Sequence, residues 1–408
     1  MIKGDPGTRR LWQTVFFCFI LAAVTGVLFR FGMIVPLPDV LSLQNVRHAH
    51  SHLMFFGWAT PLPLYIFWKR LRTRIEPVSG KIGLDLMYGS LWGILLFGLL
   101  SYPFFLLYGY QPVPLGSTTL PLSVICSGLV MIGWYGYIAG YLMARKQVGR
   151  SFSQMWFEAA LLMLFICSLG AWGVAVTQAL DTANPLFGKA LTHFFLACFT
   201  EGWIVLITVA LLAEALNLNA SDFRLSPNLL AGLILVGAPM TFPYGISQSL
   251  MTLPMLYTAR AGGFLVGMAV LGTGLQILRS DGMRRSLLRW PLALLLLKAV
   301  MQVTASVIPS DFWLSDYALR ILYLHILLLG AFTLAGIGFM HRFASVKTRS
   351  FTGVVFSVLI LLISLLMLTR FWPAGWSGIW LFYAITGASL LPAIAVGVEW
   401  RELARTSV

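Results

Sequence analysis

Recurrent apolar runs, each long enough to cross a lipid bilayer, constrain this chain more than any other feature of its sequence. A membrane-spanning helix needs about 20 mainly apolar residues, and runs of that length follow one another between clusters of Pro, Gly and charged residues. With 59% hydrophobic and only 10% charged residues, the chain is too apolar for a soluble globular, disordered or secreted disulfide-rich protein. The pattern predicts an all-α integral membrane protein, with a single bundle of about twelve transmembrane helices in one polytopic domain over residues 1–408. The predicted spans lie near 12–33, 48–68, 86–108, 119–143, 155–179, 190–215, 227–247, 256–278, 290–308, 318–340, 352–371 and 378–398.

The distribution of basic residues along the chain indicates its orientation in the membrane. The formal net charge is +14, a value that would suggest nucleic-acid binding in a soluble protein. Twelve spans place both termini on one side, and about three quarters of the Lys and Arg then fall on that side, which the positive-inside rule assigns to the cytoplasm. We therefore expect an N-in, C-in protein of a bacterial inner (cytoplasmic) membrane, with the lipid bilayer as its partner and no nucleic acid.

The sequence argues against a disulfide framework, a c-type haem, a phosphate-binding loop and a cleaved signal peptide. All four cysteines, Cys18, Cys126, Cys167 and Cys198, lie in predicted spans, and the chain has no CxxC or CxxCH motif. This pattern argues against a disulfide framework and a covalently attached c-type haem. No phosphate-binding glycine loop occurs. The first span has no small-residue cleavage site, so it is predicted to be a retained helix.

Five of the six histidines have similar predicted depths in the membrane. His48, His50 and His52 open the second span, and His48 and His52 share one helical face because they are four residues apart. His193 lies in the sixth span and His325 in the tenth, both near the outer side. The alternative for His48, His50 and His52 is a histidine cluster at the membrane interface without a ligand. The alternative for His193 and His325 is a hydrogen-bonded histidine in the protein core. The sixth histidine, His341, is predicted to be an interfacial residue at the cytoplasmic side.

A haem is the cofactor that this arrangement favours. Neutral imidazole is the commonest metal ligand, and two histidines from facing helices are a usual way to hold a b-type haem. Arg47, Arg320 and Arg370 are the outer cations near these spans, and they are candidates for binding haem propionates. The alternative for each arginine is an ordinary interfacial anchor.

Ionisable residues inside the spans are the next functional candidates, since they are costly at membrane depth. Glu201 lies in the middle of the sixth span, where we expect a proton relay. Lys298 in the ninth span either reaches an interface or pairs with a carboxylate. Glu158 is near an interface, where its charge can reach water, and Arg30 pairs with either a carboxylate or a propionate.

The twelve spans, with histidines in spans two, six and ten, resemble subunit I of the haem-copper oxidase and nitric oxide reductase superfamily. In that family spans two and ten each supply an axial ligand to a low-spin haem, and His52 and His325 are the matching positions. The stretch from His193 to Glu201-Gly202 is similar to the nitric oxide reductase pattern in span six. The resemblance covers the whole chain by topology and three spans by motif.

The chain also departs from that family. Ala197 stands where the family has its span-six metal ligand, and Tyr323 stands where span ten has its first histidine. The predicted seventh span has no histidine pair. The resemblance therefore implies an electron-entry haem with an incomplete binuclear centre.

A second resemblance is to NnrS-type membrane proteins, which are linked to haem, copper and nitric oxide stress. It is carried by His50-Ser51-His52 with Gly57 and by His325 with Gly330. The acidic residue that follows the second histidine in that family is replaced by Leu53.

These features together predict one b-type haem between His52 and His325, with His48 as the substitute for His52. His48, His50 and His193 remain for a copper or non-haem iron site, since imidazole suits both metals. The resemblance implies electron transfer or chemistry linked to nitric oxide or dioxygen, with a c-type cytochrome or quinol as electron donor. Whether the protein is an enzyme stays open; an oxidoreductase of the nitric oxide reductase or terminal-oxidase type is the class implied.

A proton-coupled secondary transporter is the alternative from a different class. It would use Glu201, Lys298 and the breaks that Pro239, Pro243 and Gly245 introduce into span seven.

Overall fold

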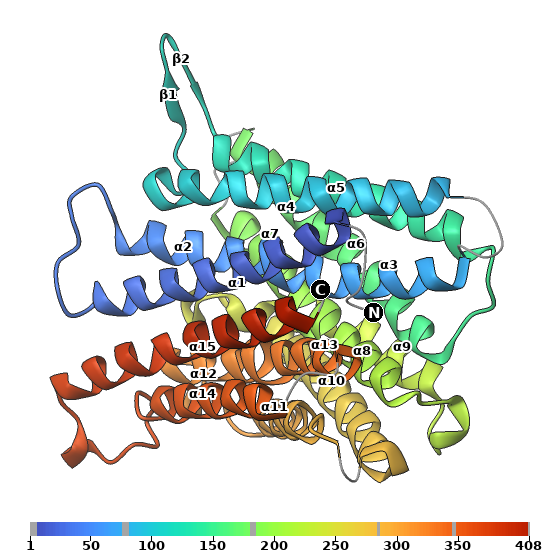
Figure 1. The fold of residues 1–408 in the computed structure, drawn as a ribbon. Helices are drawn as coiled ribbons and strands as arrows, with labels where there is room; N and C mark the ends of the chain where they lie inside the picture. Colours follow the sequence, from blue (N-terminus) through green and yellow to red (C-terminus); the bar gives the residue numbers. More distant parts are fainter. Residues whose placement is uncertain (1–5, 76–80, 180–184, 284–285, 345–347, 407–408) are drawn as a thin grey trace. The chain divides into compact units, whose positions relative to one another are not determined.

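Helices make up most of the computed structural model, which describes residues 6–75, 81–179, 185–283, 286–344 and 348–406 (Figure 1). Within these ranges, eleven helices are long and apolar enough to cross a membrane. This confirms the predicted all-α, multi-span membrane protein. Its internal contacts group into two compact units: unit 1 is Met1–Gly149 with Met340–Val408, and unit 2 is Arg150–Phe339. Each unit is described by itself.

Unit 1 contains the first spans and the last ones, and most of its helices begin or end within a few residues of the predicted limits. Its helix α1 packs against α2 and α15, and α4 packs against α5. The elements are α1 (Pro6–Phe31), α2 (Leu43–Leu53), η1 (Met54–Ala59), α3 (Pro61–Ile75), α4 (Ile82–Tyr108), β1 (Val113–Leu115), β2 (Thr118–Leu120), α5 (Leu122–Arg145), the end of α13, α14 (Thr348–Leu366), η9 (Ala374–Trp376) and α15 (Ile379–Thr406).

Unit 2 contains the central part of the sequence. Its elements are α6 (Phe152–Ala179), α7 (Pro185–Ala197), η2 (Cys198–Ile204), α8 (Val205–Leu216), η3 (Ala220–Asp222), α9 (Pro227–Met240), η4 (Phe242–Gly245), η5 (Gln248–Leu250), α10 (Leu253–Arg279), η6 (Asp281–Met283), α11 (Arg289–Val307), η7 (Ser310–Phe312), α12 (Tyr317–His325), η8 (Ile326–Thr333) and most of α13 (Leu334–Ala344). The run Leu186–Leu216 is the most enclosed span, with 94% of its apolar window buried, followed by Tyr317–Arg342 with 72%. Glu201 and His325 are therefore carried by the two best-buried runs.

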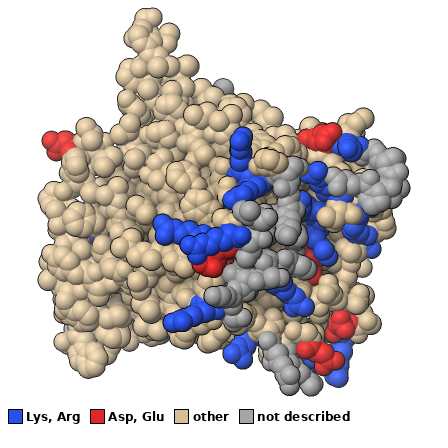
Figure 2. Space-filling view, viewed as in Figure 1, with Lys and Arg blue, Asp and Glu red and all other residues tan. Residues whose placement is uncertain are grey.

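The outer surfaces of both units suit a lipid environment. Large apolar side chains are exposed there, among them Leu96 and Phe356 in unit 1 and Val236 in unit 2. In Figure 2 most of the visible surface is uncharged, and the Lys and Arg side chains occupy a small part of it. Lipid chains can cover such a surface without leaving charges unsolvated.

The second predicted span, 48–68, is built from three consecutive pieces and is not among the eleven spans. Helix α2 already begins at Leu43, the π-helical η1 follows, and α3 begins at Pro61. The Thr60 amide donates to the Phe55 carbonyl, five residues back. Proline has no amide hydrogen to donate, so the normal hydrogen-bond ladder cannot continue through Pro61.

One predicted helix end was wrong, and the chain after α4 is not all helix. The seventh span covers Pro227–Gly245, close to the predicted end at residue 247, but its α-helix α9 ends at Met240 and a 3-10 turn follows, because Pro239 and Pro243 remove two hydrogen-bond donors. The eleventh span ends at Leu366 and not near 371, so Arg370 lies beyond the helix. Strands β1 and β2 form an antiparallel hairpin that projects beyond α4 and α5 (Figure 1).

Candidate functional site

Three π-helical segments lie in the three runs that carry the predicted ligands. Segment η1 begins two residues after His52, η2 contains Glu201, and η8 begins directly after His325. A π-helical segment is rare and is frequently found at functional sites, because it re-aims the side chains next to it. Each of the three runs selected from the sequence thus contains an interruption of its α-helix.

His50 has the geometry of a preset metal ligand. Its Nδ1 lies 2.7 Å from the Ala22 carbonyl oxygen in α1, an acceptor that fixes the proton on Nδ1. A methyl group at Gly26 would lie 2.9 Å from the His50 Cε1 atom, so the missing side chain at Gly26 makes room for the ring. An Nδ1–H bonded to a carbonyl orients an imidazole and leaves Nε2 as the basic atom.

His52 is held differently. Its Nε2 lies 2.8 Å from the Tyr110 hydroxyl, and its ring stacks on Phe105 with the ring centroids 3.8 Å apart. Its Nδ1 is buried and has no hydrogen-bond partner in the described part of the chain. Burial raises the pKa of Tyr110 to about 12, so the hydroxyl keeps its proton at neutral pH. Of the two ring nitrogens of His52, Nε2 is therefore engaged by Tyr110 and Nδ1 is not.

His48 packs against the same tyrosine, with ring centroids 4.8 Å apart. The three histidines of α2 thus divide into two groups: His50 faces α1, while His48 and His52 face Tyr110. His50 and His52 therefore differ in the ring nitrogen that has a partner, which is Nδ1 in His50 and Nε2 in His52.

The predicted propionate-binding arginines have different surroundings. Arg47 and Arg370, both in unit 1, are exposed. Arg320 of unit 2 donates to the Leu314 carbonyl through one terminal nitrogen, and its buried Nε has no hydrogen-bond partner among the described residues. Their binding of propionates stays a prediction.

A buried polar cluster surrounds Glu201 in unit 2. Lys298 Nζ lies 2.5 Å and Gln302 Nε2 lies 2.9 Å from one carboxylate oxygen, and the Tyr323 hydroxyl donates to the other over 2.9 Å. Lys298 also donates to the Gln302 side-chain oxygen over 2.6 Å. The Lys298 side chain is fully buried, and only 6% of Glu201 is exposed. We call these four residues, Glu201, Lys298, Gln302 and Tyr323, the Glu201 cluster.

The cluster joins η2, α11 and α12, and it explains how two charges are tolerated at membrane depth. A lone charged side chain at the centre of a spanning helix costs about 2.5–3.5 kcal/mol by insertion measurements. Here the ammonium and the carboxylate neutralise each other, and both carboxylate oxygens accept hydrogen bonds. Of the two alternatives for Lys298, pairing with a carboxylate is the one observed.

The other two predicted histidines of unit 2 each lie against backbone. A Cβ atom at Gly245 would lie 2.0 Å from His193 Nδ1, so the His193 ring packs directly on η4. His325 Nδ1 lies 2.8 Å from the Ile321 carbonyl oxygen. Within the ranges that the structure describes, no group of three or more His, Cys, Asp or Glu side chains could hold a metal ion. A metal site made by His48, His50 and His193 stays a prediction, because His193 belongs to unit 2 and the others to unit 1.

Glu399 was not predicted as a candidate, and the structure pairs it with His341, whose predicted position at the cytoplasmic interface stays a prediction. His341 Nδ1 lies 3.0 Å from Glu399 Oε1, with 8% and 0% of the two side chains exposed. The other carboxylate oxygen of Glu399 is buried without a described partner. The signal available in the sequence was an acidic residue directly after the last apolar run, but α15 continues through it to Thr406.

Neither a protein-family model nor a curated protein matches the chain. Its function is therefore inferred from its residues and their geometry.

Proposed function

We propose that this chain is a multi-pass membrane protein that binds one b-type haem and takes part in electron transfer or in redox chemistry linked to nitric oxide or dioxygen. The observation that carries the proposal is the fixed orientation of His50, with its Nδ1 on the Ala22 carbonyl and its ring over Gly26. A ligating histidine usually has such a partner for its second nitrogen, because the bond fixes the tautomer and the ring plane.

The residues present fit an axial haem ligand at His50 better than at His52, whose Nε2 is bonded to Tyr110. His325 is the proposed second ligand. Its pairing with an α2 histidine is drawn from the family resemblance, and its Nδ1 contact with the Ile321 carbonyl is compatible with coordination through Nε2. A bound b-type haem would supply one-electron transfer, while the protein sets its orientation and surroundings.

Tyr323 and Glu201 support a protein with an incomplete second metal centre. Tyr323 stands where the resembled family has a histidine, and here its hydroxyl donates to the Glu201 carboxylate. In this proposal Glu201 holds or transfers a proton inside the membrane. A c-type cytochrome or quinol as donor and a bacterial inner membrane complete the proposal, with an NnrS-like protein as the second resemblance. Copper or non-haem iron at His48, His50 and His193 belongs to the alternative in which His52 holds the haem, because His50 has only one ring nitrogen left for a metal.

The test is a reduced-minus-oxidised spectrum of the purified protein, together with its haem and iron content. We expect a b-type spectrum that is lost in His50→Ala and His325→Ala. His341→Ala is the control and keeps its haem, because His341 pairs with Glu399 and has no role in binding a cofactor. Loss of haem in His52→Ala but not in His50→Ala would assign the ligand to His52. A protein without bound iron or a Soret band would overturn the haem proposal.

A proton-coupled secondary transporter is the second candidate, and the fully buried Lys298–Glu201 pair favours it. Interrupted helices next to such pairs line substrate sites in many transporters, and α9 ends in a 3-10 turn in the same unit. Proton-dependent uptake by vesicles that contain haem-free protein, abolished in Glu201→Gln, would favour this function.

A further inference from the structure

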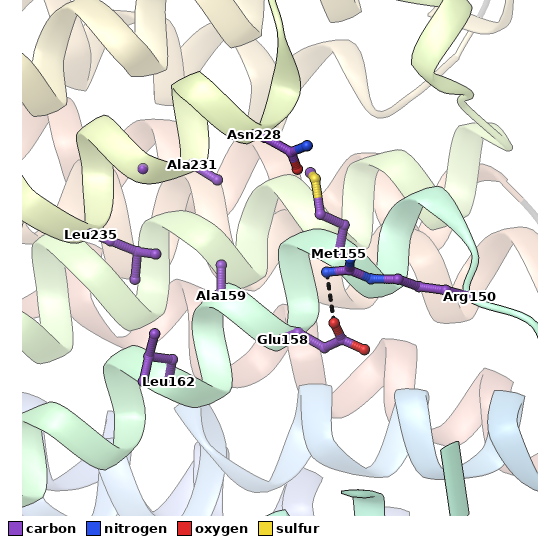
Figure 3. A pocket seen from close by; sticks show the side chains of 9 residues that line it. Arg150, Met155, Glu158, Ala159, Leu162, Asn228, Ala231 and Leu235 are labelled. Atoms are coloured by element: carbon purple, nitrogen blue, oxygen red, sulfur yellow. Dashed lines mark ion pairs between the residues drawn. The ribbon is translucent and has the colours of Figure 1, made fainter. Parts of the chain in front are cut away.

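A shallow pocket of about 290 Å³ lies between α6 and α9 of unit 2. This volume is just below the roughly 300–1,000 Å³ of small-molecule sites, so it suits part of a larger molecule. Figure 3 shows the Arg150–Glu158 ion pair at one end of the pocket and Leu162 and Leu235 at the other. The lining is thus charged at one end and apolar along the rest.

The pocket opens towards lipid. Leu162 is 49% exposed and belongs to an apolar outer surface. On α9, a methyl group at Gly232 would meet no atom within 4 Å, so this glycine leaves open space beside the helix. The molecule available to fill an open, apolar groove on the surface of a membrane span is a lipid chain.

The charged end lies near the boundary between the headgroups and the hydrocarbon core. With 28 residues at 1.5 Å each, α6 is about 42 Å long, close to the roughly 40–45 Å of a bilayer with its headgroups. Glu158 lies six residues after the start of α6, about 9 Å along it. Arg150 precedes the helix and reaches Glu158, with 2.6 Å between the guanidinium nitrogen and the carboxylate oxygen.

The two charges select among headgroups. Arg150 is 48% exposed and Glu158 is 17% exposed, so both can meet a ligand. A purely anionic headgroup would be attracted by Arg150 but repelled by the Glu158 carboxylate. A headgroup with a phosphate and a primary ammonium carries the complementary pair, and Asn228 at the start of α9 adds a neutral hydrogen-bonding group.

We propose that this groove binds a glycerophospholipid with an aminoethyl headgroup. The phosphate lies on Arg150, the ammonium lies on Glu158, and one acyl chain runs along Leu162 and Leu235. This inference is independent of the haem proposal.

The test is native mass spectrometry of delipidated protein after exchange with vesicles of equal parts phosphatidylethanolamine, phosphatidylcholine and phosphatidylglycerol. We expect about tenfold more phosphatidylethanolamine than phosphatidylglycerol to be retained, the factor expected for one charge-assisted hydrogen bond. Phosphatidylcholine has no ammonium hydrogen to donate to Glu158 and should be retained less. Equal retention of the three lipids would overturn the proposal.

Two variants separate the charges. Glu158→Gln leaves Arg150 unpaired, so it should reverse the preference towards phosphatidylglycerol, whereas Arg150→Gln should lower retention of both lipids. A third variant, Gly232→Trp, fills the open space in the groove and should abolish retention. Its matched control is Gly353→Trp on α14, where a side chain would also meet no atom within 4 Å. Unchanged lipid binding in folded Gly232→Trp would contradict the site.

Discussion

Gly26 has no side chain, and the His50 ring occupies the space that a side chain there would fill. Gly26→Ala should therefore displace the imidazole and break its hydrogen bond to Ala22. We expect haem content to fall about tenfold, in line with the 10–100-fold effects of disturbing a ligand's orienting partner. Gly89→Ala is the control, because a methyl group there meets nothing within 4 Å. Equal haem content in the two variants would contradict the role of His50.

The Lys298–Glu201 pair can be tested by a double-mutant cycle. Lys298→Met leaves the Glu201 carboxylate buried without its counter-charge, and removing one partner of a buried pair costs about 3–5 kcal/mol. Adding Glu201→Gln removes the charge that was left, so the double variant should recover most of the lost stability. Thermal unfolding in detergent measures each corner of the cycle, and additive losses would show that the two residues do not interact.

The sequence alone predicted only part of the Glu201 cluster. Glu201 and Lys298 could be selected as candidates because an ionisable residue in an apolar run is visible without a structure. Gln302 and Tyr323 could not, since uncharged polar residues are common in spans and their role depends on which helices are neighbours. The engagement of His52 by Tyr110 was equally hidden, because Tyr110 lies in the connection after α4.

At the scale of helices, length and apolar composition predicted nearly every span, while the π-helical interruptions within spans could not be predicted. The π segments depend on hydrogen bonds such as that from Thr60 to Phe55, which no periodicity of side chains reports. Pro239 and Pro243 predicted a break in span seven, but not the residue at which α9 ends.

Close packing of α4 on α5 depends on glycine. A Cβ atom at Gly140 would lie 2.7 Å from the Gly83 carbonyl oxygen, an approach of the kind that small residues permit between membrane helices. Gly140→Ile should therefore separate the helices and destabilise the protein by about 1–3 kcal/mol. Gly93→Ile on α4 is the control, since that position is open. Thermal inactivation of the purified variants compares them, and equal midpoints would refute the packing role.

For the molecule as a whole, the orientation in the membrane can be measured with introduced cysteines. The four native cysteines are free and buried in the structure, so their background labelling should be low. With N-in, C-in topology, Thr118→Cys in the β1–β2 hairpin should react with an impermeant maleimide in intact cells. Gly149→Cys, after α5, should react only once the cells are permeabilised. The reverse pattern would invert the predicted orientation.

The Glu201 cluster has a consequence for how this membrane protein can exchange protons. As built, the ammonium and the carboxylate sum to zero, so the site is electroneutral. A proton that neutralised Glu201 would leave Lys298 as an uncompensated positive charge in a low-dielectric interior, at a large electrostatic cost. If the site takes up a proton, we therefore expect the uptake to be coupled to the arrival of a negative charge or the departure of a positive one.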